Sequence, residues 1–270
     1  MKKILSSILI FSLISGTIIS CRKKDKGSPP ALISAETMQI DYFKLTYGAF
    51  VNNFDVKGID DSNWKAAAEI ISPWRELTDV TLSIPVFAYK AAIGYRASHL
   101  SGSKWEWSYD VNVSGTTYNV RLTGETAGSQ VKWEMYVASG SGGFSEFKWL
   151  DGTSNVNGNT GVWTFYESPA SSTPLLQIDW TKSGASIEKI KYTYLKSGSN
   201  KDAYIEYGSA SGGGYDSYYE VYYYNETISQ FSSATIEWSR TSKTGRIKSD
   251  SYLDGNWQCW DTQQINATCN

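Results

Sequence analysis

His99 is the only histidine in the 270-residue chain, so it is the first candidate for a catalytic base. A base of this kind acts with a serine or cysteine nucleophile. The sequence contains no Gly-x-Ser-x-Gly elbow, no His-Glu-x-x-His zinc pattern and no Walker phosphate loop. His99 lies in a polar link between two regions of different composition. We therefore expect no catalytic residue in this chain, and a single histidine excludes a multi-histidine metal centre.

Glutamates of the second half are the candidates for glycoside cleavage, which requires two carboxyl groups facing one sugar. Those that fall in segments with a strand pattern are Glu134, Glu206, Glu220 and Glu237. A strand glutamate beside a lysine on a polar face, such as Glu134 beside Lys132, is typical of a solvated surface. A carbohydrate-active enzyme stays an alternative, and no glutamate is assigned a catalytic role.

The segment Asp151 to Asn159 is the one candidate metal site. Asp151, Asn155 and Asn157 place oxygen side chains at alternate positions, as in calcium loops. The segment has only one carboxylate and no closing glutamate, and Asn, Asp and Gly are also ordinary hairpin residues. We expect no bound metal and no cofactor.

Tyrosines are the most distinctive side chains with binding chemistry, with 19 in the chain. A strand ending near Tyr224 would place Tyr219 and Tyr223 on one face, and Tyr218, Tyr222 and Tyr224 on the other. Flat amphipathic rings suit sugar faces and protein surfaces. Cross-strand packing between tyrosines is the structural alternative. Tyr218, Tyr222 and Tyr224 are the predicted ligand-binding residues, with a glycan or a protein as partner.

Residues 1–20 have the pattern of a secretory signal peptide. Lys2 and Lys3 give a positive start, an apolar stretch follows, and small polar residues end it. The stretch is too short, and too soon followed by charge, for a membrane-spanning helix.

Ile18-Ile19-Ser20-Cys21 resembles the lipobox of bacterial lipoproteins: a branched aliphatic residue, a permitted second residue, a small residue and then cysteine. The resemblance covers residues 1–21. It implies that the Cys21 thiol receives diacylglycerol and that the new amino terminus is usually acylated too. Two or three buried acyl chains hold a protein on a bilayer almost permanently. The resemblance thus predicts a lipid-anchored protein of the bacterial cell envelope, at the outer membrane, facing the periplasm or the exterior.

The chain divides into three parts, of which the signal peptide, residues 1–20, is the first. Residues 21–33 form the lipidated cysteine and a charged, flexible tether. Residues 34–270 form a single domain, helical over 34–100 and a β-meander over 101–270. Outside the cytoplasm, two remaining thiols near the C-terminus are expected to pair, which predicts a Cys259–Cys269 disulfide.

Helical spacing marks the first part of this domain. Ser34 is positioned to cap a helix that continues to residue 49. Asp61 or Ser62 caps a second helix, which Pro73 should end or kink because proline donates no hydrogen bond. A short third helix is predicted after Pro85.

A period of two begins at Lys104, where aromatic and aliphatic residues alternate with polar ones for ten residues. The predicted strands span 104–113, 118–123, 131–137, 144–150, 162–167, 175–181, 187–195, 202–207, 216–224, 234–240, 246–252 and 256–261. Links this short require antiparallel pairing, and a twisted sheet this wide will curl. The predicted class is α+β and predominantly antiparallel β, with short N-terminal helices packed on a large curved meander sheet that forms a half-barrel or open barrel.

Composition and architecture leave a short list of functions. With 25 basic and 27 acidic side chains, the chain is not a strongly basic nucleic-acid binder. The leading hypothesis is an envelope lipoprotein that binds a ligand or partner through its aromatic sheet without catalysis. One alternative is a half-barrel carrier or chaperone for hydrophobic cargo, which requires an unfilled apolar cavity. The others are a carbohydrate-active enzyme and a purely structural lipoprotein.

Overall fold

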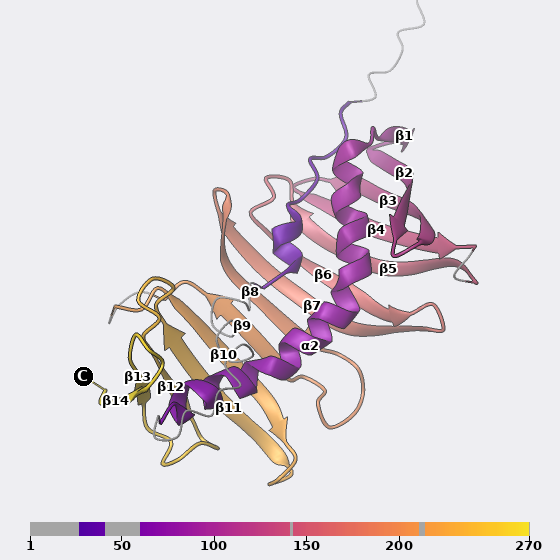
Figure 1. Ribbon diagram of the computed structural model, residues 1–270. Coiled ribbons are helices and arrows are strands. Elements are labelled where there is room, and N and C mark those ends of the chain that lie inside the picture. The colour runs from indigo at the N-terminus through magenta and orange to yellow at the C-terminus, as the bar shows by residue number, and fades with distance from the viewer. Residues whose placement is uncertain (1–26, 41–59, 141–142, 211–213, 270) are drawn as a thin grey trace, which may run out of the picture.

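The computed structural model describes residues 27–40, 60–140, 143–210 and 214–269. In these residues fourteen strands form one open antiparallel sheet, each strand hydrogen-bonded to the next in chain order (Figure 1). One long helix, α2 (Ser62–Ala91), crosses one face of the sheet, and two 3-10 segments, η1 (Ala35–Met38) and η2 (Ala92–Gly94), precede and follow it in the chain. The predicted α+β fold with a predominantly antiparallel meander is confirmed.

The strands are β1 (Ser98–Ser101), β2 (Lys104–Val113), β3 (Thr116–Ala127), β4 (Gln130–Ser139), β5 (Phe144–Asn155), β6 (Thr160–Ser168), β7 (Ser171–Ser183), β8 (Ser186–Tyr194), β9 (Tyr204–Gly208), β10 (Ser217–Asn225), β11 (Gln230–Trp238), β12 (Gly245–Ser249), β13 (Gln258–Trp260) and β14 (Asn266–Ala267). The twelve predicted strands correspond to β2 through β13. The edge strands β1 and β14, with four and two residues, are too short to show an alternation that sequence reading can detect.

Helix α2 corrects the prediction of separate helices before Pro73 and after Pro85, because it continues for 30 residues through both prolines. Each proline removes a backbone hydrogen bond and costs roughly 3 kcal/mol in a helix interior. The buried stripe nevertheless runs past both of them, with Ile71, Leu82 and Tyr89 all less than 5% exposed. Burial of this stripe on the sheet offsets the cost of the prolines. Figure 1 shows the helix bending as it crosses the sheet, as proline-containing helices do.

The predicted first helix is seen only in part. Ser34 caps the 3-10 segment η1 as expected, since its Oγ accepts a hydrogen bond from the Glu36 amide at 3.3 Å. The rest of that predicted helix, residues 41–49, lies outside the described residues.

Tryptophans fill the face of the sheet that α2 and η1 cover. Four of them lie directly across from a glycine on the preceding strand, in the pairs Gly124–Trp133, Gly152–Trp163, Gly161–Trp180 and Gly245–Trp260. Each of these indoles is no more than 2% exposed. A Cβ built on any of the four glycines would lie within 2.7 Å of the facing indole. The glycines are therefore needed for the space they leave, which lets a flat ring lie against the neighbouring strand.

Buried tyrosine hydroxyls fasten the N-terminal segment to this core. The Ile33 amide donates to the Tyr89 hydroxyl at 3.0 Å, and the Ile40 amide donates to the Tyr192 hydroxyl at 2.9 Å. The Tyr192 hydroxyl in turn donates to the Met38 carbonyl at 2.9 Å. These bonds satisfy backbone groups that would otherwise be buried without partners.

We expect the protein to lose stability steeply above about pH 10. Burial raises the pKa of Tyr89, Tyr109 and Tyr192. The folded protein keeps these phenol protons while the unfolded chain loses them near pH ~10, so the stability they contribute is present below about pH 10 and lost above it. Each group lowers the free energy of unfolding by about 1.4 kcal/mol per pH unit there. Urea unfolding at several alkaline pH values measures this slope.

The matched variant for this measurement is Tyr192→Phe. It removes one titrating group, so its stability should fall less steeply with pH than that of the wild type. Equal slopes in the two proteins would contradict a role for Tyr192 in the alkaline transition.

Candidate functional site

Two pockets flank helix α2 at opposite ends of the strands β8 to β12. Because consecutive strands of the meander run in opposite directions, β8, β10 and β12 all point the same way. Their C-terminal ends therefore lie on one side of the sheet and their N-terminal ends on the opposite side. One pocket is lined by residues at or just after the C-terminal ends of these three strands. The second is lined by residues from the opposite strand ends. The helix contributes residues to both pockets because side chains three or four positions apart share one side of a helix, and those between them face another side.

The first, which we call the aromatic pocket, has a volume of about 570 Å³. Its helical wall consists of Ala66, Glu69, Ile70, Pro73, Trp74 and Leu77. Its sheet wall consists of Tyr194, Asn200, Ala203, Tyr223, Tyr224, Ser251 and Tyr252. Five of these thirteen residues are aromatic, and they come from parts of the chain more than 170 positions apart.

Hydrogen bonds within the protein fix two of the tyrosines. The Tyr223 hydroxyl is hydrogen-bonded to the Ser251 hydroxyl. The Tyr252 hydroxyl donates to Asn63 Oδ1 at 3.0 Å, next to the start of α2. Two of the four tyrosine hydroxyls therefore have partners within the protein, and their rings are held in place.

The C-terminal segment holds the start of α2 against this pocket. Cys259 and Cys269 are joined by a disulfide, with their Cα atoms 5.3 Å apart. Asn63 Nδ2 donates to the Cys259 carbonyl at 2.8 Å, and the Asn63 amide donates to Asn266 Oδ1 at 2.9 Å. The segment closed by the disulfide thus positions the helical wall of the aromatic pocket.

Among the described residues that line the aromatic pocket, Glu69 is the only charged one. Lysines nearby in the chain are in ion pairs: Lys65 with Asp61, Lys196 with Glu167 and Lys201 with Asp202. The charge at the pocket wall is therefore negative.

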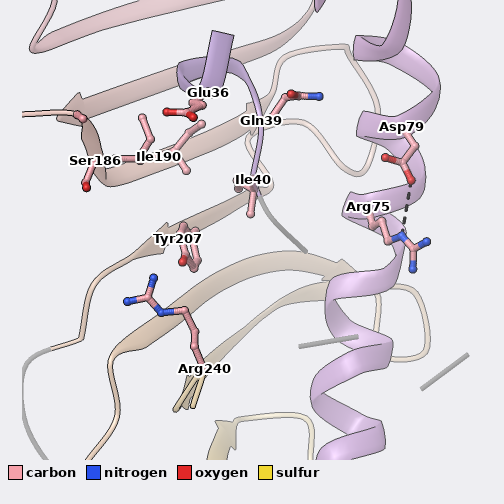
Figure 2. A pocket seen from close by; sticks show the side chains of 11 residues that line it. Glu36, Gln39, Ile40, Arg75, Asp79, Ser186, Ile190, Tyr207 and Arg240 are labelled. Carbon is pink, nitrogen blue, oxygen red and sulfur yellow. Dashed lines mark ion pairs between the residues drawn. The ribbon is translucent and has the colours of Figure 1, made fainter. Parts of the chain in front are cut away.

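The second, which we call the polar pocket, has a volume of about 610 Å³ (Figure 2). It is lined by Glu36, Gln39, Ile40, Arg75, Asp79, Ala185, Ser186, Ile187, Ile190, Tyr207 and Arg240. Figure 2 shows Arg240 extending beside Tyr207 from below, while Glu36 and Gln39 lie above and Arg75 and Asp79 lie on the helix.

The guanidinium groups of the polar pocket already face carboxylates. Arg75 Nε lies 3.6 Å from Asp79 Oδ2, and Arg240 Nε donates to Asp216 Oδ1 at 2.9 Å. Burial raises the pKa of Asp216, but hydrogen bonds from Arg240 outweigh burial, and the net pKa is lowered. The side chain of Asp79 is 64% exposed, and Glu36 is also exposed. Two carboxyl groups in water lack the desolvation that prepares a carboxyl to act as a general acid.

The predicted ligand-binding tyrosines belong to strand β10. Tyr218 and Tyr222 lie on the face opposite α2, whereas Tyr224, near the end of the strand, lines the aromatic pocket with residues of α2. Tyr222 is stacked between two rings, with its centroid 4.6 Å from that of Phe231 and 5.6 Å from that of Tyr204. Tyr224 meets Phe231 edge-on. Lys191 Nζ lies 3.6 Å from the ring centroid of Tyr204. The ring faces of Tyr222 are therefore used in cross-strand packing, which was the structural alternative to ligand binding.

Tyr218 has a structural contact as well. Its hydroxyl donates to Glu206 Oε1 at 2.7 Å, and its ring lies across Gly208. Of the three predicted residues, only Tyr224 also lines a pocket. Tyr223, which lies on the other face of the same strand, was not predicted as a binding residue. Alternation alone assigns it to the core, and no sequence signal pairs it with α2.

The predicted calcium candidates are not assembled around one point. The Asp151 carboxylate accepts from Lys148 Nζ at 2.6 Å and from the Tyr166 hydroxyl at 2.9 Å. Asn155 ends β5, where its Oδ1 accepts from the Asn159 amide at 2.8 Å. Among the described residues, no hydrogen bond joins the side chain of Asn157 to either of them.

The strand glutamates are surface groups. Glu134 is paired with Lys104 and Lys132, Glu206 with Lys189, and Glu237 with Arg246, while Glu220 is exposed. His99 Nε2 lies 3.0 Å from the Gly102 carbonyl oxygen, at the edge strand β1. Register places Glu206 across from Glu220 and Glu134 across from Asp151, but Glu206 and Glu134 are each paired with a lysine. None of these contacts brings a base and a nucleophile together.

Among the described residues, no group of three or more His, Cys, Asp or Glu side chains is arranged to hold a metal ion. No helix in this part of the chain combines the length and apolar character that a membrane span requires. The predicted lipidation site, Cys21, lies outside the described residues. Comparison of the chain with protein-family models, with curated proteins and with solved structures gave no match.

Proposed function

We propose that this protein is a lipid-anchored component of the bacterial cell envelope that binds a small ligand in the aromatic pocket without changing it chemically. The observation that carries the proposal is the convergence of Trp74, Tyr194, Tyr223, Tyr224 and Tyr252 around a pocket of about 570 Å³. Ligand pockets in proteins have volumes of roughly 300–1,000 Å³ and are lined mainly by apolar and aromatic side chains with a few polar groups.

Rigidity of the walls supports binding at this place. Tyrosine and tryptophan side chains have few rotors, so a ligand that packs against them costs little conformational entropy. Tyr223 and Tyr252 are further fixed by their hydrogen bonds to Ser251 and Asn63. A pocket formed in advance binds more tightly than one that must be ordered by its ligand.

The carrier alternative is less well supported by the packing. It requires an unfilled apolar cavity between sheet and helix. In the part of the chain that the structure describes, Trp163 and Tyr89 are in edge-to-face contact in that interface, and Ile71 is fully buried. The two pockets lie beside the helix instead of beneath it, which favours a small ligand over a bulky hydrophobic cargo.

The anchor belongs to the proposal because of the lipobox at Ile18-Ile19-Ser20-Cys21. A chain extends at most about 3.3–3.6 Å per residue, so the segment from Cys21 to Ile33, twelve residue steps, reaches no more than about 43 Å. Ile33 is fastened to Tyr89 in the core. The ligand-binding body would therefore stay close to the bilayer surface.

Binding can be tested with the neutral fluorescent probe N-phenyl-1-naphthylamine and the full-length protein in lipid nanodiscs, after subtraction of the signal from empty discs. We expect the wild type to enhance the fluorescence of the probe. Ala66→Trp places an indole on a partly buried position of the pocket wall and should reduce the enhancement at least fivefold. The matched control is Ser83→Trp, which places the same ring on an exposed position of the same helix.

An enhancement equal in the wild type and both variants would contradict binding in the aromatic pocket. The urea midpoint of each variant is measured alongside, so that loss of the signal by unfolding is recognised.

A further inference from the structure

In the part of the chain that the structure describes, the lining of the aromatic pocket combines five aromatic residues with one carboxylate and no cation. Aromatic rings carry negative charge on their faces, so they attract cations held within about 6 Å of the ring centre. Glu69 adds a full negative charge at the same wall, and its side chain is exposed at the pocket. A negatively charged ligand would meet repulsion from both.

Three of the hydroxyl groups in the pocket are already used in hydrogen bonds within the protein, which leaves fewer for a neutral sugar. The Tyr223 and Ser251 hydroxyls are bonded to each other, and the Tyr252 hydroxyl is bonded to Asn63. A polyhydroxylated ligand needs several free donors and acceptors, because each unmatched polar group that it buries costs free energy. An ammonium group with alkyl substituents needs ring faces and a negative charge instead.

Ion pairing around the pocket keeps competing cations away from Glu69. Lys65, one turn before Glu69 on α2, lies 3.0 Å from Asp61, and the lysines of the β8–β9 link are paired with Glu167 and Asp202. No ion pair of Glu69 itself is present among the described residues. The carboxylate is thus left as the group available to a cationic ligand.

We propose that the ligand of the aromatic pocket is an organic cation, a quaternary ammonium or protonated amine with an apolar body, held between the aromatic rings and Glu69. This inference rests on the proposed function, since it specifies the ligand of the same pocket.

The experiment compares choline with its neutral isostere 3,3-dimethylbutan-1-ol, which has the same shape without the charge. Binding to the full-length protein in nanodiscs of phosphatidylglycerol, which contain no choline headgroup, is measured by ligand NMR titration. We expect choline to bind at least fivefold more tightly than the isostere, and the preference to shrink as salt is raised. Glu69→Gln should reduce the preference at least threefold, whereas Glu76→Gln, an exposed glutamate of the same helix outside the pocket, should leave it unchanged.

Several results would overturn the inference. One is equal affinity of the wild type for choline and the isostere, and another is equal loss of the preference in Glu69→Gln and Glu76→Gln, which would indicate a diffuse surface effect. If either result is found while the naphthylamine probe still binds the wild type and Ala66→Trp still reduces its fluorescence enhancement, the ligand is neutral and the proposed function stands. Absence of probe binding in the wild type is the separate result that contradicts the function itself.

Discussion

Replacing Gly152 by alanine is expected to destabilise the protein by more than about 3 kcal/mol, which is a large part of the 5–15 kcal/mol typical of a folded domain. The added Cβ would lie 2.2 Å from the Val162 carbonyl oxygen and 2.5 Å from Trp163 Cε3. The first contact is with backbone of the paired strand β6, which is held by ladder hydrogen bonds on both sides. Relief of the clash would therefore require β5 and β6 to separate locally. Urea unfolding of the purified variant measures the loss.

Gly140→Ala is the matched control. It makes the same chemical change at a glycine where a Cβ would meet nothing within 4 Å and where the backbone is not left-handed. We expect its stability to lie within about 0.5 kcal/mol of the wild type. A Gly152→Ala protein as stable as Gly140→Ala would show that the sheet accommodates the methyl group, contrary to the tight glycine–tryptophan packing.

Replacing Cys21 by serine is expected to release the protein from the membrane. The wild type should sediment almost entirely with envelope membranes and incorporate labelled palmitate. The variant has no thiol to receive diacylglycerol, so it should incorporate no label. With each buried methylene worth about 0.8 kcal/mol, loss of the acyl chains removes essentially all of the membrane affinity. Fractionation of cells that express each protein, followed by immunoblotting, measures the distribution.

Cys259→Ser is the control for this experiment, since it also removes one sulfur atom but lies in the disulfide of the C-terminal segment. It should remain in the membrane fraction and keep the label. A Cys21→Ser protein that sediments with envelopes as the wild type does would contradict the lipid anchor and leave the pocket proposal intact.

The strand pattern was predictable because it is local. In β2, Trp107, Tyr109 and Val111 are buried and the residues between them face the other side, as their alternation indicates. Short links then leave antiparallel pairing as the only choice. The continuity of α2 was not predictable, since the rule that Pro73 ends a helix is also local, whereas the burial that overrides it comes from residues on the sheet.

The binding site divides in the same way. Sequence alternation correctly separates Tyr222 from Tyr223 onto opposite faces of β10, but it gives no information on which face retains space for a ligand. Tyr222 is enclosed by Tyr204 and Phe231 because register places Tyr204 directly across from it on β9 and Phe231 diagonally from it on β11, across from Tyr224. Tyr223 lines a pocket because helix α2 passes over that face.

By itself, the amino-acid sequence determined that a period of two builds a meander of consecutive antiparallel strands, and it carries the lipobox from which the anchor is proposed. These features depend on neighbours within about ten residues. The tertiary structure decided where the aromatic pocket lies, because Trp74 and Tyr252 line the same pocket only where helix α2 crosses the ends of three strands. It also decided why glycines recur in the strands, since four of them leave room for an indole and Gly208 leaves room for the ring of Tyr218, in each case a ring that the sheet register brings across from the glycine.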